Sequence, residues 1–189
     1  PMFLLEKYAV AVDKKPIITN GILGMLVAAL GDFLCQIIEN KRNISSSSNI
    51  SLSWDKKRSF NLALIRGFLV IPFVVRWYAK LAELYPETTT ISLLKRCLTN
   101  EVLGSPLMIA LVFLGNAILT TSTPKIAWNA FIDRYKKQGI STWISSFSFW
   151  PLCHVLVTFR LPLHYQPLWA SFAAVYWNAI LSYHTNVEL

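Results

Sequence analysis

Long apolar blocks alternate with short polar stretches along the chain. Four blocks are predicted to form membrane-spanning helices, at residues 17–38, 60–81, 98–119 and 168–183. A helix rises 1.5 Å per residue, so about 20 residues cross roughly 30 Å of hydrocarbon, and slightly shorter blocks also suffice. The pattern therefore predicts an all-α integral membrane bundle of about four transmembrane helices, in one domain over residues 1–189.

Two further segments are apolar but do not match a full span. In residues 124–139, aromatic and aliphatic side chains recur every three or four positions with basic residues elsewhere around the helix, which is typical of an amphipathic helix in the membrane surface. Pro124 suits its first turn, and Gly139 is expected to end it. Residues 143–159 contain Pro151, so we expect a broken or shallow helix there.

The connection between the first two spans has a different composition. Residues 44–53 are mostly Ser and Asn with no helical period, which predicts a flexible loop. With two antiparallel pairs of spans, both termini are expected on the same side of the membrane.

Composition agrees with a membrane protein. The chain has 54% hydrophobic and 15% charged residues, whereas soluble domains carry about 25% charged residues. A soluble protein with buried helices is the alternative, and the length of the apolar blocks argues against it. The net charge of +8 would also suit nucleic-acid binding, but the basic residues are dispersed over the loops. Anionic lipid headgroups explain the charge more simply, so we expect a lipid bilayer and no direct nucleic-acid partner.

Charged and polar residues inside the predicted spans are the candidate functional sites. Asp32 and Gln36 lie in the first span, Arg66 and Arg76 in the second, and Glu101 opens the third. A charge near the bilayer centre costs about 2.5–3.5 kcal/mol, so such groups are usually paired or face a wet cavity.

Depth along antiparallel helices predicts which of these charges pair. Asp32 lies about seven residues before the first span ends, and Arg66 about seven residues after the second begins. Arg76 and Glu101 are similarly matched at the other surface, so we expect two ion pairs. The functional interpretation is a polar-lined interior, and the structural one is ion pairing that locks the helices; the sequence leaves both open.

Small residues predict how the first helix packs. Gly21, Gly24, Ala28, Gly31 and Cys35 form one stripe along it. Such stripes let transmembrane backbones approach closely. Asp32 borders the stripe, so its side chain is expected to face the bundle.

The order of motifs resembles the Mpv-type family of the 22-kilodalton peroxisomal membrane protein, over about 175 residues. The residues that carry the resemblance are Tyr8, Pro16, Thr19, Gly31-Asp32, Gln36, Asp55, Arg58, Gly67, Pro72, Trp77-Tyr78, Pro106, Trp150-Pro151, Pro162-Leu163-His164-Tyr165, Trp177 and Leu181-Ser182. The resemblance implies a protein of the mitochondrial inner membrane, or alternatively of the peroxisomal membrane, with small-solute channel activity.

The chain departs from the family pattern at several polar positions. Ile71 replaces a glycine, Asn100-Glu101 replaces Asp-Gln, and His154 replaces a glutamine. Val157-Thr158 and Gln166 are also different from the family's usual residues. His154 therefore joins the candidate pore-lining residues, and divergence of this kind also fits a member that serves as a scaffold.

Three classes of function follow from these observations. The first is a small-solute channel, and the second is an accessory subunit of a larger inner-membrane, respiratory-type complex. We therefore expect a homo-oligomer or a larger membrane assembly. An enzyme is the third, but the sequence has no phosphate-binding loop, zinc signature or nucleophile motif. We expect no enzymatic activity, catalytic residue, metal site or cofactor.

Overall fold

The computed structural model describes residues 2–46 and 54–187, and the side chains of residues 7–40 and 54–177. The described chain is helical throughout, apart from short connections. The all-α fold class is confirmed.

The N-terminal half contains two long helical rods. Helix α1 (Met2–Lys14) is followed at once by α2 (Pro16–Ser46). The second rod consists of α3 (Lys56–Ile65), the π-helical segment η1 (Arg66–Val70) and α4 (Ile71–Leu84). The first three residues of the loop predicted at 44–53 are helical, because α2 continues to Ser46. Residues 47–53 lie outside the described part.

The C-terminal half adds three more rods. The first comprises α5 (Thr90–Thr99), the π-helical segment η2 (Asn100–Gly104) and α6 (Ser105–Thr120). Helix α7 (Pro124–Leu156) follows. Two short 3-10 turns, η3 (Thr158–Arg160) and η4 (Leu163–Tyr165), then lead into α8 (Gln166–Val187).

Four helical rods within the described residues are long and apolar enough to cross a membrane: Pro16–Asn40, Lys56–Leu84, Thr90–Thr120 and Pro124–Arg160. The first three correspond to predicted spans. The fourth is α7, which the sequence analysis treated as two lesser segments. The predicted block at 168–183 lies within the 22-residue helix α8.

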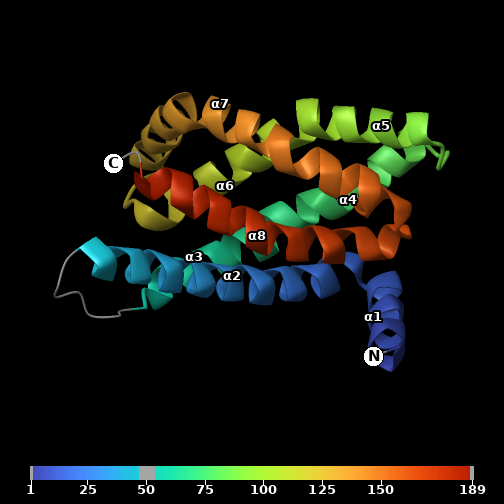
Figure 1. Cartoon of the computed structure of the whole chain (residues 1–189), viewed down its shortest axis with the longest axis horizontal. Coiled ribbons are helices and arrows are strands. Elements are labelled where there is room, and N and C mark those ends of the chain that lie inside the picture. Colours follow the sequence, from blue (N-terminus) through green and yellow to red (C-terminus); the bar gives the residue numbers. More distant parts are fainter. Residues whose placement is uncertain (1, 47–53, 188–189) are drawn as a thin grey trace.

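The boundary predicted at Gly139 is wrong. Thr123 accepts the N–H of Ile126 at the start of α7, as a cap should, but the helix then runs for 33 residues without interruption. It also continues through Pro151, which removes only one backbone donor. The first turns of α7 stand at a steep angle to the long axis of the bundle (Figure 1). Their position in the membrane surface remains a prediction.

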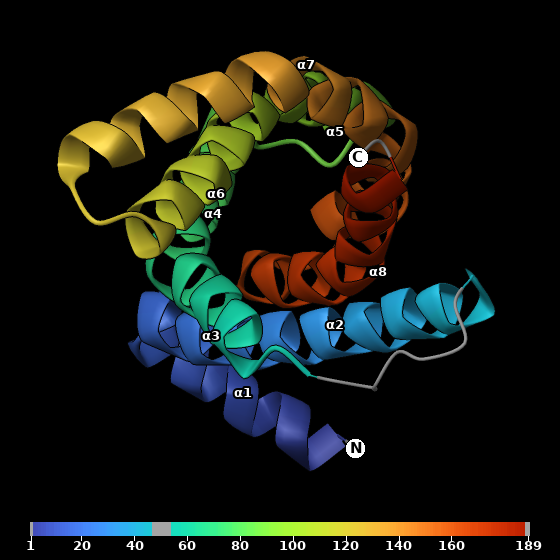
Figure 2. The ribbon, with the colours of Figure 1, turned by 90° about the vertical axis from the view of Figure 1, so that its left-hand side faces the viewer.

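The long rods surround a common centre. Figure 2 shows α4 and α6, then α7, then α8 around it, with α2 closing one side. The stripe of small residues on α2 supports this packing: a Cβ atom at Gly24 would lie 2.6 Å from Cγ1 of Ile71, and one at Gly21 would lie 3.3 Å from the Gly67 carbonyl oxygen. Gly31 faces α8, with Val175 next to it. The close approach that the stripe predicts is therefore present.

Successive rods run in opposite directions, and α8 makes a fifth pass along the bundle. Helix α1 consequently lies at one end of the long axis, and α8 finishes at the other (Figure 1). The placement of both termini on one side of the membrane stays a prediction, and this arrangement favours opposite sides if α7 and α8 both cross the bilayer.

We expect tags fused to the two termini to lie on opposite sides of the membrane. In sealed vesicles, protease added outside should remove only one tag. A cysteine at Glu87, which lies in the connection between α4 and α5, should be labelled from the same side as the N-terminal tag. Removal of both tags from outside would contradict the five-pass arrangement.

Candidate functional site

The first buried polar group is the Asp32 cluster, formed by Asp32, Gln36, Arg58 and Ser59. The Asp32 side chain is 3% exposed, and its Oδ1 lies 2.9 Å from Nε of Arg58. Its Oδ2 accepts hydrogen bonds of 2.6 Å from Ser59 Oγ and from Gln36 Nε2. Gln36 Oε1 accepts the backbone N–H of Asp55 at 2.7 Å, which fixes the start of α3 against α2.

The predicted pairing of Asp32 with Arg66 is wrong. The depth count assumed that the first two spans end at one level, but α2 continues to Ser46, beyond the start of α3 at Lys56. Asp32 therefore lies level with the first turn of α3, where Arg58 reaches it. Arg58 was noted only as part of the family motif, because it lies outside the predicted span.

The second buried group is the Glu101 cluster, formed by Glu101, Asn100, Ser105, Ser146 and His154. Glu101 is fully buried. Its Oε2 accepts hydrogen bonds from Ser105 Oγ at 3.0 Å and Ser146 Oγ at 3.2 Å, and its Oε1 accepts one from Asn100 Nδ2 at 3.1 Å. His154 Nε2 lies 3.0 Å from Asn100 Nδ2 and 3.7 Å from Glu101 Oε1. The cluster joins η2 and α6 to α7.

The predicted pairing of Glu101 with Arg76 is also wrong. The buried residues of α4 include Val74, Tyr78 and Leu81, which share one helical face, and Arg76 is exposed on the opposite side. Trp77, not Arg76, reaches the Glu101 cluster, where its Nε1 donates to Asn100 Oδ1 at 2.9 Å. Matching depths identified the level of Arg76 along the helix axis, but they did not determine which side of the helix it lies on.

Both π-helical segments precede a proline and carry one of the intramembrane charges. Pro72 and Pro106 have no N–H, and a proline ring clashes with the carbonyl four residues earlier. The wider turn avoids this clash: the N–H of Ile71 bonds to the Arg66 carbonyl, and that of Ser105 to the Asn100 carbonyl, each five residues back. Arg66 and Glu101 thus sit where the helices are locally widened, a feature frequent at functional sites.

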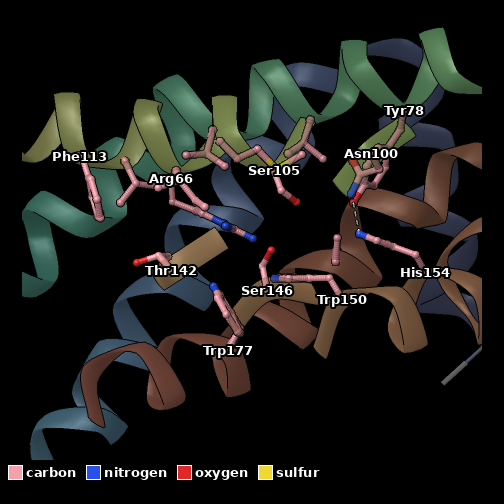
Figure 3. A pocket seen from close by; sticks show the side chains of 16 residues that line it. Arg66, Tyr78, Asn100, Ser105, Phe113, Thr142, Ser146, Trp150, His154 and Trp177 are labelled. Atoms are coloured by element: carbon pink, nitrogen blue, oxygen red, sulfur yellow. Dashed lines mark hydrogen bonds between the residues drawn. The ribbon is translucent and has the colours of Figure 1, made fainter. Parts of the chain in front are cut away.

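A cavity of about 110 Å³ lies at the centre of the bundle. Its wall comes from the second and third rods, α7 and α8, and includes polar groups of Asn100, Ser105, Thr142, Ser146 and His154. Figure 3 shows the guanidinium group of Arg66 extending into this space. Arg66 has no hydrogen bond or ion pair with any residue that the structure describes.

The structure thus divides the six candidate residues among four environments. Glu101 and His154 share one cluster, Asp32 and Gln36 another, Arg66 faces the cavity, and Arg76 is outside. The sequence analysis missed the roles of these partners: Arg58, Ser59, Ser105, Ser146, Trp150 and Trp177. Ser105 carried a detectable signal, because it follows Glu101 by one helical turn.

Three comparisons place the chain among known proteins. The family model described as Mpv17 / PMP22 family matches residues 122–182. A Drosophila melanogaster protein named mitochondrial inner membrane protein Mpv17 is 26% identical, over 91% of this chain and 97% of its own length. Protein SYM1 of Saccharomyces cerevisiae is 24% identical, over 98% and 91%. Peroxisomal membrane protein 2 of Bos taurus is 23% identical, over 96% and 89%. No solved structure matches the chain.

These matches confirm the resemblance predicted from the motifs. The names of these relatives also agree with the expected location, the mitochondrial inner membrane with the peroxisomal membrane as alternative.

We predict that Asp32 is energetically coupled to Arg58 and not to Arg66. Asp32→Asn should lower the free energy of unfolding by about 1–3 kcal/mol, because hydrogen bonds to a buried charge are weakened. The Arg58 side chain is 35% exposed, which screens the ion pair and keeps the loss within that range.

A double-mutant cycle in detergent, followed by unfolding, measures this coupling. Asp32→Asn combined with Arg58→Gln should cost less than the sum of the single changes, with a coupling of at least about 0.5 kcal/mol. The matched pair, Asp32→Asn with Arg66→Gln, should be additive. Coupling in the second pair and additivity in the first would show that the contact is misassigned.

Proposed function

We propose, from its resemblance to the Mpv17 / PMP22 family and from the central cavity, that this chain forms a channel for small solutes in the mitochondrial inner membrane. The observation that carries the proposal is Arg66, a charged side chain inside a membrane bundle that faces a largely apolar cavity with a few polar groups in its wall and has no hydrogen-bond or ion-pair partner among the described residues.

The energetic argument concerns why such an arginine is present. A charge at this depth is costly, and a purely structural role would favour pairing it. The Asp32 and Glu101 carboxylates are both occupied by other groups, and neither forms an ion pair with Arg66. An arginine facing open space therefore fits a wet pathway better than a helix lock.

A second cavity suggests the route that a solute would take through the bundle. It has a volume of about 310 Å³ and is lined by residues near the α1 end of the bundle, including Asp13, Asn20 and His164. Helix α4 lies between the two cavities: Val74 and Tyr78 line the central one, while Val75 and Ala79 line the other. We propose that solute passes across the seam between α4 and α8.

An accessory subunit of a larger inner-membrane complex is the second candidate function. It is favoured by the Asp32 and Glu101 clusters, because each carboxylate is held by hydrogen bonds within its own cluster and joins neighbouring helices. In this proposal the clusters hold a rigid surface for docking. We assign neither candidate an enzymatic role.

Cysteine modification distinguishes a conducting cavity from a packed core. In a variant without Cys35, Cys97 and Cys153, Thr142→Cys would place a thiol at the central cavity. Ile144→Cys is the matched control, because Ile144 lies two residues further along α7 and is 62% exposed on its outer surface. We expect a water-soluble thiol reagent to reduce the conductance of purified Thr142→Cys protein in planar bilayers and to leave Ile144→Cys unchanged.

The outcomes separate the two candidate functions. A well-folded preparation that does not conduct would rule out the channel, and migration with a larger complex in native electrophoresis would then favour the accessory subunit. Conductance that is blocked equally in both cysteine variants would place the pathway elsewhere.

A further inference from the structure

We propose that the central cavity is a binding site for a small monoanion, either a carboxylate or an inorganic anion, held by Arg66 and by the indole N–H groups of Trp150 and Trp177. The binding site stands independently of transport. Its interpretation as the site of the transported solute rests on the proposed channel.

The first argument is charge. Arg66 carries five N–H donors in a fixed planar arrangement and has no acceptor capacity. Its guanidinium extends into the cavity, and none of the described residues accepts a hydrogen bond from it. Arg58 differs, because its guanidinium lies against Asp32 and Glu39. Arg66 therefore lacks the kind of anionic partner that Arg58 has.

The second argument is the hydrogen-bonding character of the wall. Figure 3 shows the ring nitrogens of Trp150 and Trp177 pointing into the same space as the guanidinium. Trp177 is 8% exposed, yet neither indole N–H has a hydrogen-bond partner among the described residues. Buried tryptophan N–H groups usually find an acceptor. Three groups that can only donate thus converge on one space, which suits a ligand rich in acceptors.

The carboxylate of Glu101 does not supply that acceptor. It lies behind the cavity wall, and its two oxygens already accept from Asn100, Ser105 and Ser146. The Ser105 hydroxyl donates to this carboxylate, and the Ser146 hydroxyl has both the carboxylate, at 3.2 Å, and the Trp143 carbonyl oxygen, at 2.7 Å, as acceptors. The carboxylate nevertheless keeps a negative charge near the site, so a singly charged ligand matches Arg66 better than a multiply charged one.

The third argument is size. A volume of about 110 Å³ leaves room for several water molecules. An anion about the size of nitrate or acetate fits this space. The cavity therefore suits small monoanions by charge and by hydrogen-bonding character, and it has room for them.

Thermal unfolding of the purified full chain in detergent tests this site. At constant ionic strength, sodium gluconate is replaced stepwise by sodium acetate or, separately, by sodium nitrate. We expect a saturable rise in Tm with at least one of them, because a ligand that binds only the folded state stabilises it. Response to acetate alone identifies a carboxylate site, and response to both identifies a general monoanion site.

Two arginine variants provide the matched comparison. Arg66→Gln should weaken the apparent anion affinity at least tenfold, because it removes the charge at the cavity. Arg76→Gln removes the same charge from the outer face of the second rod and should leave the affinity unchanged. Trp177→Phe, which removes one N–H donor, should weaken it several-fold and replaces Arg66→Gln as the test if that variant does not fold.

Two results would overturn the proposed anion site. One is the absence of a saturable rise in Tm in the wild-type protein, and the other is an equal rise in Tm in Arg66→Gln or Trp177→Phe. Binding without conductance would retain the site and remove the channel. Conductance without binding would retain the channel and remove the site.

Discussion

Polar groups surrounded by hydrocarbon need partners within the protein, because no water is available to satisfy them. In this chain that constraint acts at two places. The Asp32 carboxylate holds α2 against the start of α3, and the Glu101 carboxylate holds the third rod against α7. The stripe of glycines on α2 allows the backbones to approach closely enough for the first contact. These contacts fix α2 against the second rod and the third rod against α7.

Because buried polar groups need partners, Arg66 is informative, since it is an intramembrane charge without a hydrogen-bond or ion-pair partner among the described residues. Arg66 enters the bundle from a widened π-helical turn that Pro72 imposes, and it meets open space in place of a carboxylate. Trp150 and Trp177 add donors on the opposite wall. A bundle that satisfies two buried carboxylates but leaves the Arg66 guanidinium facing a cavity has a place for a negatively charged ligand. We propose that this place is the functional centre.

Much of the fold was predictable from the sequence, since apolar blocks and small-residue spacing are local signals. The first three spans, the α8 helix and the face of α2 that packs were all predicted correctly. The continuity of α7 was not, because Gly139 and Pro151 often end soluble helices but are tolerated where neighbouring helices support them. Gly139 does not adopt the positive φ that would have ended the helix.

The site was predicted only in part. The intramembrane position of Asp32, Arg66 and Glu101 is a property of the sequence, and all three are important in the structure. Their partners depend on rotation about the helix axis and on where neighbouring helices end, which depth counting does not provide. Arg58 lay outside the predicted span, and Arg76 faces outward. The cavity forms where four rods meet, so no local sequence pattern predicts it.

The reversal potential in planar bilayers under a salt gradient tests the central claim most directly. If small anions pass Arg66, the wild-type reversal potential should lie toward the equilibrium potential of chloride. Arg66→Gln should shift it toward that of the cation, and Arg76→Gln should leave it where it was. A well-folded wild-type protein that conducts with the same reversal potential as Arg66→Gln, or that does not conduct at all, would contradict the account.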